Sequence, residues 1–364
     1  MRVVFYTMSM CKGGTERVIS EICNYGVARG HEMHIITCLK ESPEYELNRC
    51  VMLHLGAFSQ SEYKLKSKLH TLAGLMNHYV KQVIDIDPDI VVAFLPEPCM
   101  ITEICKYRVK KPIIGSLRSN PYYQYRSMVR HCLAELLYPL SDGFVFQTEG
   151  ARRYFGKRLQ RRSVVIGNPV RKLASITYEA CKQKQDIVSV GRFTEEKNYP
   201  LLIKAFYEVQ KEKPEYELKI YGRVDERLGL RELCKSLEID AKVHFCGQVD
   251  YVEDYIRDAA LYVMSSKSEG MPNALMEAMA LGLPVVATDC PSGGSRQLIR
   301  DGENGILVQN DDVSALAAGM LRVLNDDSLA EALAEKARNI AQEYACDEIC
   351  LKWLEYMQGI VEGR

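Results

Sequence analysis

Short runs of β-branched and aromatic residues alternate with helical patterns along the whole chain, and this alternation most constrains the fold. In the first half, residues 16–27 carry apolar side chains at the spacing of one helix face. The strands expected there cover residues 3–7, 33–37, 90–94, 113–117, 143–147 and 164–166. Strands that alternate with helices form parallel sheets with helices on both faces. The sequence therefore predicts an α/β fold.

The same cycle restarts in the second half. Its expected strands cover residues 187–190, 217–221, 243–246, 261–264 and 285–287, and its expected helices cover 199–211, 227–237, 273–280 and 313–324. A polar, lysine-rich stretch after Pro169 precedes the restart, so we place a domain boundary there. Ligands of doubly wound sheets lie beyond the carboxyl ends of the strands. Two such sheets predict a site in the cleft between them.

The length of 364 residues fits about two domains of ~150 residues each. No apolar run approaches the ~20 residues that span a bilayer, and residues 1–10 are too short for a signal peptide. The 13 cysteines are odd in number, never form CxxC pairs and include Cys38, Cys99 and Cys246 within apolar stretches. This use of cysteine is typical of reduced thiols, so we expect a cytoplasmic protein.

The net charge of −1 hides an asymmetry between the two halves. Residues 1–170 carry 23 Lys and Arg against 15 Asp and Glu, with basic segments at 64–68, 118–130 and 152–162. These segments are either solvated surfaces or a basic face that docks on an anionic membrane or a polyphosphate substrate. No nucleic-acid-binding module accompanies the charge, so we do not expect nucleic acid as a partner.

Glycines follow the first strand of each half. Gly13 and Gly14 form a strand-to-helix turn that either approaches an anion or is a tight turn with no ligand. The motif is not GxGxxG, so a dinucleotide site is poorly supported. In the second half, Arg192 and Lys197 follow Gly191 and the first strand directly. Their position predicts two cations at the ligand-facing end of the sheet.

The segment 265–273 leads from a strand into a helix for which Pro272 suits the first position. The amides and dipole of this helix would face the same site. Glu269 and Glu277 flank its start with the spacing E-x₇-E. Glu277 either accepts hydrogen bonds from a vicinal diol, as in a ribose, or only pairs with a nearby basic side chain.

At these residues the chain resembles a known family. The segments SVGRFTEEKN, SSKSEGMPNALMEAMALGLPVVAT, CPSGG and IRDGENGILV are similar to the retaining, nucleotide-sugar-dependent glycosyltransferases of family 4, including capsule, O-antigen and lipid-linked oligosaccharide transferases. GGTERVI and GNPV fit as well, so the resemblance covers essentially the whole chain. It implies the GT-B fold, with two Rossmann-like domains facing across a cleft. Residues 1–168 would bind the acceptor, 169–344 would bind the donor, and a helix in 345–364 would return to the first domain.

The resemblance also implies roles for individual residues. Arg192 and Lys197 would grip the donor diphosphate, Glu277 the ribose, and Glu269 would lie beside the donor sugar. The catalytic group would be Arg192, Lys197 and Glu269. The loop at 247–252 would hold the base, and further donor contacts would come from Gly14, Met271, Pro272, Asn273, Ala274 and Leu275.

Two positions depart from the family pattern. Many members carry a histidine near the donor sugar where this chain has Arg118, although a subset of capsule and O-antigen transferases shows a similar Ser-x-Arg pattern. Arg118 is therefore a candidate contact to the donor sugar or the acceptor. Arg223 stands in a YGRV segment where GxG is commoner, and it either contacts phosphate or base or faces solvent.

The chemistry that we expect is transfer of a sugar with stabilisation of the departing nucleoside diphosphate by fixed positive charge. No pair of carboxylates is identifiable as nucleophile and acid, so we expect same-face attack by the acceptor hydroxyl and retention of configuration. We expect no cofactor and no metal. A DxD motif at residues 85–89 precedes the strand 90–94, which places it at the amino end of the sheet, away from the ligand.

The expected function is transfer of a hexose or N-acetylhexosamine from a nucleotide-sugar, UDP-linked by family pattern, to a hydroxyl of a lipid-linked glycan. The setting would be cell-surface polysaccharide or glycoconjugate biosynthesis, with the protein peripheral on the inner face of the membrane. Two alternatives stay open. One is a GT-B sugar-nucleotide epimerase, although that class lacks the E-x₇-E pattern. The other is a protein that binds a nucleotide-sugar without catalysis.

Overall fold

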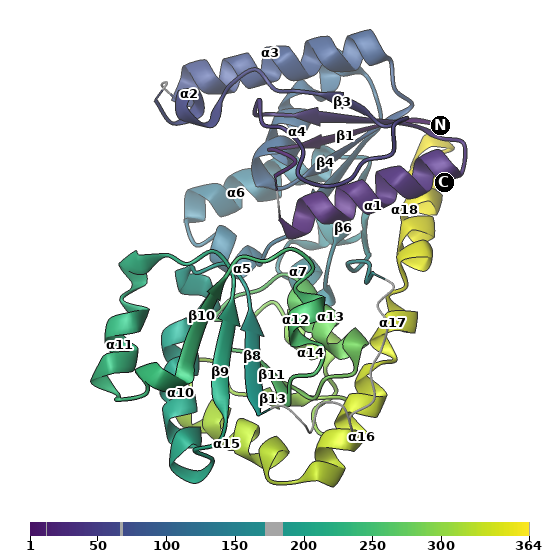
Figure 1. Cartoon of the computed structure of the whole chain (residues 1–364). Helices are drawn as coiled ribbons and strands as arrows, with labels where there is room; N and C mark the ends of the chain where they lie inside the picture. Colours follow the sequence, from purple (N-terminus) through teal and green to yellow (C-terminus); the bar gives the residue numbers. More distant parts are fainter. Residues whose placement is uncertain (12, 66–67, 172–184, 364) are drawn as a thin grey trace. The chain divides into compact units, whose positions relative to one another are not determined.

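The computed structural model describes residues 1–11, 13–65, 68–171 and 185–363, with the backbone only at 64, 65, 68 and 69. These residues form two compact units, Met1–Pro169 with Cys346–Arg364 (unit 1) and Val170–Ala345 (unit 2) (Figure 1). The sequence places the boundaries at 168/169 and 344/345, and the units divide one residue later at each. The side chains of the basic segment 64–68 lie outside the described residues.

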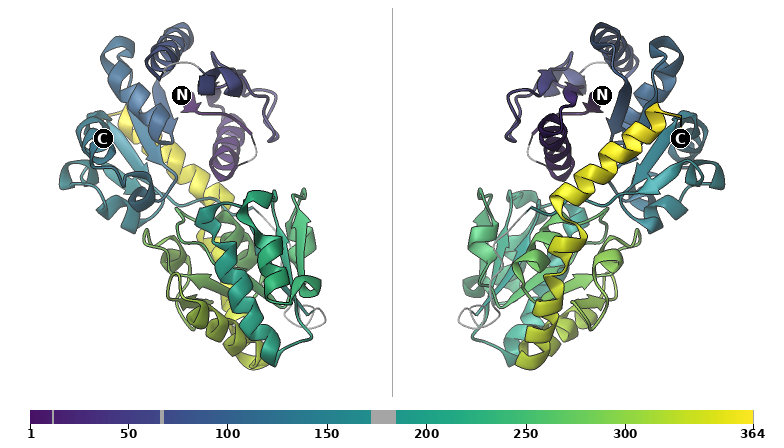
Figure 2. Two further views of the ribbon diagram at one scale, coloured as in Figure 1. Left: turned by 90° about the vertical axis from the view of Figure 1, so that its left-hand side faces the viewer. Right: turned by 90° about the vertical axis from the view of Figure 1, so that its right-hand side faces the viewer.

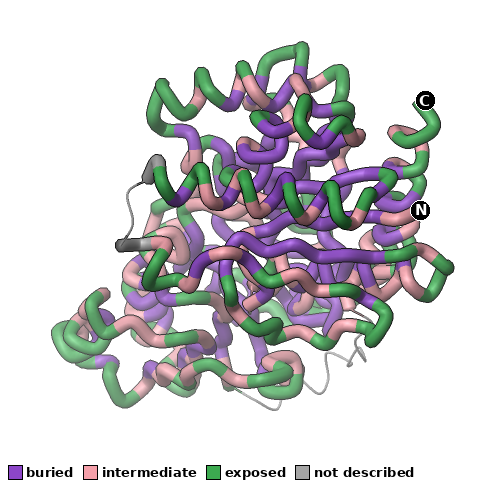
Figure 3. The backbone as a smooth tube through the Cα atoms, turned by 90° about the horizontal axis from the view of Figure 1, so that it is seen from above, coloured by how far each residue is buried: buried purple, intermediate pink, exposed green. Residues whose placement is uncertain are grey.

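Unit 1 is built on a parallel sheet with the strand order β3-β2-β1-β4-β5-β6-β7. Its strands are β1 (Arg2–Thr7), β2 (Glu32–Thr37), β3 (Met52–His54), β4 (Ile90–Phe94), β5 (Ile113–Leu117), β6 (Gly143–Phe146) and β7 (Ser163–Val165). Strands such as β4 and β5 are buried along their whole length because helices cover both faces of the sheet. Figure 3 shows this burial in purple, with exposed residues gathered on the surrounding segments.

The helices of unit 1 range from single turns to a helix of 19 residues. They are α1 (Gly14–Ala28), α2 (Gln60–Leu65), α3 (Lys68–Ile86), α4 (Pro96–Val109), α5 (Pro121–Gln124), α6 (Met128–Leu137), η1 (Tyr138–Leu140), α7 (Glu149–Arg153), α8 (Lys157–Gln160) and α18 (Cys346–Val361). Within the described part of the chain, no helix is both long enough and apolar enough to cross a bilayer.

Unit 2 repeats this architecture with the strand order β10-β9-β8-β11-β12-β13, again parallel. The strands are β8 (Asp186–Val190), β9 (Glu217–Tyr221), β10 (Val243–Gly247), β11 (Leu261–Met264), β12 (Val285–Thr288) and β13 (Ile306–Val308). The helices are η2 (Glu195–Lys197), α10 (Tyr199–Glu212), η3 (Glu226–Leu228), α11 (Leu230–Ser236), η4 (Asp240–Lys242), α12 (Glu253–Ile256), α13 (Asn273–Leu281), α14 (Gly294–Leu298), α15 (Val313–Leu324), α16 (Asp327–Ala337) and α17 (Ile340–Glu343).

Both sheets reverse their strand order at a central pair. In unit 1 the pair is β1 and β4, and in unit 2 it is β8 and β11. Loops diverge in opposite directions from the carboxyl ends of such a pair, which leaves a crevice where ligands bind. The prediction of doubly wound parallel sheets is confirmed, and the loops after β8 and β11 become the first place to look for a site.

Helix α18 carries the end of the chain back to unit 1, where it packs against α1 (yellow in Figure 2). Trp353 on this helix is fully buried and stacks on Phe94 at the end of β4, with 5.4 Å between ring centroids. The Tyr356 hydroxyl accepts from the Phe144 amide and donates to the Arg162 carbonyl, each at 3.1 Å. The terminal helix is therefore part of the core of unit 1.

Replacing Phe94 by alanine should destabilise unit 1 by ~3–5 kcal/mol, because a buried ring is lost and the cavity closes only in part. Trp353 is the only tryptophan of the chain, so its fluorescence during urea unfolding reports on this unit. The control is Lys352→Ala, at an exposed position of α18 next to Trp353. It should change the free energy of unfolding by less than ~0.5 kcal/mol. Equal unfolding midpoints for Phe94→Ala and the control would contradict the packing role.

Candidate functional site

The carboxyl edge of the unit 2 sheet is lined by glycines. Gly191 and Gly222 follow β8 and β9, and Gly247 ends β10. The amide of Gly191 donates to the Tyr221 carbonyl at 2.9 Å, and the amide of Gly222 donates to the Gly247 carbonyl at 2.8 Å. A Cβ at position 222 would lie 1.9 Å from the Gly191 carbonyl oxygen, and φ there is +149°, so only glycine fits. At these three positions the edge carries no side chain.

An arginine comes directly after two of these glycines. Arg192 and Arg223 are both exposed, and neither forms an ion pair with any described residue. They follow β8 and β9, which are neighbours in the sheet. Two unneutralised cations therefore accompany the glycine-lined edge.

The loops after β8 and β11 meet through an ion pair. The Lys197 ammonium lies 2.6 Å from Oε1 of Glu269, and the two side chains are only 21% and 14% exposed. The Ser266 hydroxyl donates to the same carboxylate oxygen at 2.7 Å. The structure thus brings together two of the residues singled out from the sequence, and it adds Ser266, which the sequence did not single out.

Backbone contacts hold these loops in register. The Ser265 hydroxyl donates to the Lys197 carbonyl at 2.9 Å, and the Lys267 amide donates to the Glu196 carbonyl at 2.7 Å. Asn198, with a left-handed φ of 51°, ends η2 and donates to Asp311 at 3.0 Å. Because these contacts fix the backbone at Lys197, its ammonium is held at one end of β8.

Helix α13 begins immediately after this loop. The helix starts at Asn273, as the predicted range 273–280 has it, and Pro272 is the N-cap residue rather than the first helical residue. The Pro272 side chain makes no capping hydrogen bond. A Cβ on Gly294 would lie 2.0 Å from the Gly270 carbonyl oxygen, so the start of α14 packs tightly against the loop that leads into α13.

The other predicted donor contacts lie in the residues that lead into α13 and in its first two turns. Met271, Pro272 and Leu275 are buried, whereas Asn273, Ala274 and Glu277 are half-buried. The Ser292 hydroxyl donates to the Glu269 carbonyl, which adds a second contact between this loop and the following segment. The helix dipole places positive potential at this end, which closely follows Glu269, the partner of Lys197, in the sequence.

Arg118, predicted to contact the sugar or the acceptor, is buried in unit 1. Its Nη1 donates to the Ile166 carbonyl at 3.4 Å, and its Nη2 donates to Oδ1 of Asn168. The guanidinium lies 5.5 Å and 5.9 Å from the ring centroids of Phe94 and Trp353. Burial lowers the pKa of Arg118 to about 9. Both terminal nitrogens therefore serve contacts inside the unit, and a role toward a ligand remains a prediction.

The glycine turn after β1 makes contacts within unit 1. Gly13 is the N-cap of α1, its amide donates to the Tyr45 hydroxyl at 3.0 Å, and that hydroxyl donates back to the Gly13 carbonyl at 2.7 Å. Gly14, the predicted contact, is the exposed first residue of the helix. No sequence signal points to Tyr45, because it lies 32 residues away in a segment without regular structure.

The DxD motif has structural partners at the amino edge of the unit 1 sheet. Asp87 pairs with Lys111 at 2.6 Å, which lowers the pKa of that carboxyl, and Asp89 accepts from the Arg2 amide at 2.7 Å. These contacts tie together the segments that enter β1, β4 and β5. Among the residues with described positions, no cluster of three His, Cys, Asp or Glu could hold a metal ion.

Two family models match adjacent parts of the chain. The model described as Glycosyltransferase Family 4 matches residues 12–171, and the model described as Glycosyl transferases group 1 matches residues 176–340. Together they span nearly all of both units.

Relatives and solved structures extend over the full length. A GalNAc-α-(1→4)-GalNAc-α-(1→3)-diNAcBac-PP-undecaprenol α-1,4-N-acetyl-D-galactosaminyltransferase of Campylobacter jejuni is 26% identical over 99% of this chain and 99% of its own. Sucrose-phosphate synthase of Thermosynechococcus elongatus has a TM-score of 0.86 at 18% identity, with 100% of both chains covered. HepE of Anabaena in complex with UDP-glucose has a TM-score of 0.80 at 16% identity and covers 99% of this chain and 100% of its own. These structures share the fold. With both family models matched and the motifs placed at the edge of the unit 2 sheet, the chain belongs to family 4 of the glycosyltransferases.

Proposed function

We propose that this glycosyltransferase moves a hexose or N-acetylhexosamine from a UDP-sugar to a hydroxyl of a lipid-linked glycan, with retained configuration and without a metal ion. Unit 2 binds the donor and unit 1 the acceptor. The observation that carries the proposal is the ion pair of Lys197 with Glu269, shortly before the start of α13 and beyond the carboxyl ends of β8 and β11.

This arrangement supports binding of a diphosphate. Lys197 is a compact point charge held by its own backbone contacts, and Arg192 is an exposed cation five residues before it. The N-terminus of α13 adds the positive end of a helix dipole. Glycines at 191 and 222 let a ligand approach the strand ends closely.

The same groups support catalysis. When the bond between the anomeric carbon and the diphosphate oxygen breaks, negative charge grows on the leaving group. Fixed cations aimed at that charge stabilise the transition state more than the ground state. We propose that the acceptor hydroxyl attacks from the face that the diphosphate leaves and that a leaving phosphate oxygen takes its proton. Glu269, held by Lys197 and Ser266, then lies beside the donor sugar.

The donor and acceptor classes are supported by similarity. The Campylobacter relative is named as a transferase of an N-acetylhexosamine to an undecaprenol-linked glycan, and the HepE structure contains UDP-glucose. The family pattern and the HepE complex favour UDP as the carrier. An undecaprenol-type acceptor would bring the enzyme to an anionic membrane surface, so we propose peripheral contact of unit 1 with the membrane.

Removing divalent cations with EDTA should leave the rate of transfer unchanged, because the proposed charge stabilisation uses Arg192, Lys197 and α13. The measurement is release of UDP from a panel of UDP-sugars in the presence of a lipid-linked acceptor, with and without EDTA. A loss of activity that Mn²⁺ restores would contradict the metal-free mechanism.

The same panel separates the alternatives. A sugar-nucleotide epimerase would convert the donor without any acceptor, and a non-catalytic protein would bind UDP and transfer nothing. Acceptor-dependent release of UDP is the result expected of a transferase.

Lys197→Ala should lower kcat by about 10²- to 10³-fold, with a smaller effect on donor affinity, because the ammonium acts mainly on charge that develops in the transition state. Lys204→Ala, at an exposed position of α10, is the matched control. Steady-state kinetics and calorimetric binding of UDP separate the two effects. If turnover and affinity fall by the same factor, Lys197 is only an anchor.

Glu277→Ala should weaken UDP binding by about 10- to 100-fold, because a ribose diol loses a charged acceptor worth ~1.5–3 kcal/mol. Isothermal calorimetry with UDP is the measurement. Glu303→Ala, at an exposed position of unit 2, is the control. Unchanged affinity of the Glu277 variant would reject the ribose role.

A further inference from the structure

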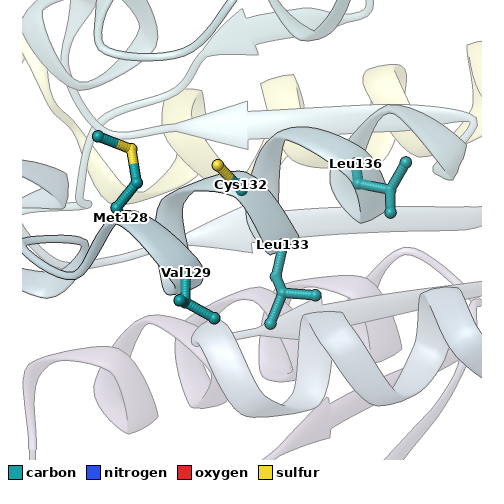
Figure 4. Close-up of a pocket in the computed structure, with 5 residues that line it drawn as sticks. All are labelled: Met128, Val129, Cys132, Leu133 and Leu136. Atoms are coloured by element: carbon teal, nitrogen blue, oxygen red, sulfur yellow. The ribbon is translucent and has the colours of Figure 1, made fainter.

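Helix α6 of unit 1 turns an apolar stripe to the outside. Met128, Val129, Leu133 and Leu136 are 74%, 68%, 42% and 64% exposed, and Cys132 between them is exposed as well. Ala134 is the buried residue of the helix, on the opposite side at 3.6 residues per turn. An ordinary surface helix buries its apolar face, whereas α6 exposes its apolar face to solvent. Figure 4 shows the five side chains on successive turns of one helix, where they line an open groove.

The polar side of α6 is held by the rest of unit 1. The His131 ring lies 5.2 Å from that of Tyr154, and Glu135 accepts from the Gly156 amide at 2.7 Å. Helix α6 also contacts α4. These contacts fix which side of the helix faces out, so the apolar stripe is a stable feature of the fold.

Unpaired cations flank the stripe. Arg126 and Arg130 lie before and within α6, and Lys157 directly follows Gly156, whose amide bonds to Glu135 of α6. All three are exposed, and none forms an ion pair within the described ranges. Arg158 and Arg161 continue this basic surface and are also exposed.

The acidic residues nearby are already neutralised or hydrogen-bonded. Glu149 pairs with Arg152 and Arg153 at 3.3 and 3.1 Å, and Asp142 pairs with Lys106 at 2.8 Å. Arg152 and Arg162, part of the basic segment 152–162, also donate to backbone carbonyls inside the unit. The positive charge available to a partner therefore comes from the cations beside α6 rather than from the whole segment.

We propose that the apolar stripe of α6, with Arg126, Arg130 and Lys157 beside it, is the surface by which this chain docks on an anionic lipid bilayer. The inference deepens the peripheral membrane contact proposed above by naming the helix that inserts. Apolar side chains on one face with cations at its border suit the boundary between headgroups and acyl chains. A second copy fits less well, because a two-fold dimer through this face would bring its own cations together.

The test is co-sedimentation of the full chain with vesicles of 70% phosphatidylcholine and 30% phosphatidylglycerol, and with pure phosphatidylcholine. Val129→Glu combined with Leu136→Glu should reduce the partition coefficient onto the mixed vesicles at least tenfold. Arg126→Glu combined with Arg130→Glu should weaken binding to the mixed vesicles and abolish the preference for them over pure phosphatidylcholine. Ile84→Glu combined with Tyr107→Glu is the control, since these exposed apolar residues of unit 1 lie on α3 and α4.

Val129 and Leu136 on α6 and the control residues Ile84 and Tyr107 are all more than half exposed, so the variants should fold. Circular dichroism and UDP affinity check that they do. If the variant with Val129→Glu and Leu136→Glu bound the mixed vesicles as strongly as the wild type, the inference would be overturned. Any contact with the membrane would then be made by another surface. A wild-type dimer in sedimentation velocity that these substitutions dissociate, with vesicle binding unchanged, would overturn it in favour of a second copy. Absence of sugar transfer with intact vesicle binding would reject the proposed reaction and leave the docking surface.

Discussion

The ion pair between Lys197 and Glu269 joins two loops that lie 72 residues apart in the chain. It exists because β8 and β11 are neighbours at the point where the sheet of unit 2 reverses its order. Both side chains are largely shielded from water, and Ser266 gives the carboxylate a second donor. Loss of one partner would leave a poorly solvated charge, which is more costly than loss of a surface pair. The geometry of the candidate donor site therefore depends on this contact.

Glycines allow the same region to be compact without being covered. Gly222 brings β9 within contact distance of the Gly191 carbonyl, and Gly294 does the same for Gly270 before α13. Larger residues would push these backbone segments apart and shift the helix start relative to Lys197. Positive charge at this edge comes both from the side chains of Arg192 and Lys197 and from the N-terminus of α13. Such fixed dipoles need no reorganisation when charge develops in a reaction.

Unit 1 uses its charged residues differently. Arg118 is by sequence alone a candidate for a ligand contact, whereas the sequence places the DxD carboxylates away from the ligand. Both make contacts that hold strand ends together. Arg118 in particular joins the carboxyl end of the sheet to α18 through Phe94 and Trp353. Helix α6 of this unit, in contrast, has an apolar side that faces away from the core. Its surface therefore carries the interactions that remain available to a partner.

The sequence by itself determined the two α/β halves and most of the long buried strands. β4, β5, β9 and β11 begin and end where the sequence predicts. For β4, β5 and β11 the reason is that strands covered on both faces appear as nearly continuous apolar runs. The three-residue edge strands β3 and β13 were missed, since neither is long enough to show a pattern. Helices α3, α4 and α6 were not predicted either. In α6 the apolar residues mark the outer side of the helix, which no periodicity can distinguish from an inner one.

Motif spacing also determined which residues of unit 2 follow strands, and hence that Arg192, Lys197, Glu269 and the start of α13 lie at the carboxyl edge of the sheet. Only the tertiary structure decided that Lys197 and Ser266 both contact Glu269. The same holds for the hydrogen bond of Tyr45 to Gly13 and for the burial of Arg118. The physical reason is that spacing reports on local geometry, whereas a partner across a sheet depends on strand order. Strand order is set by how all the helices and strands pack together, and no short segment carries that information.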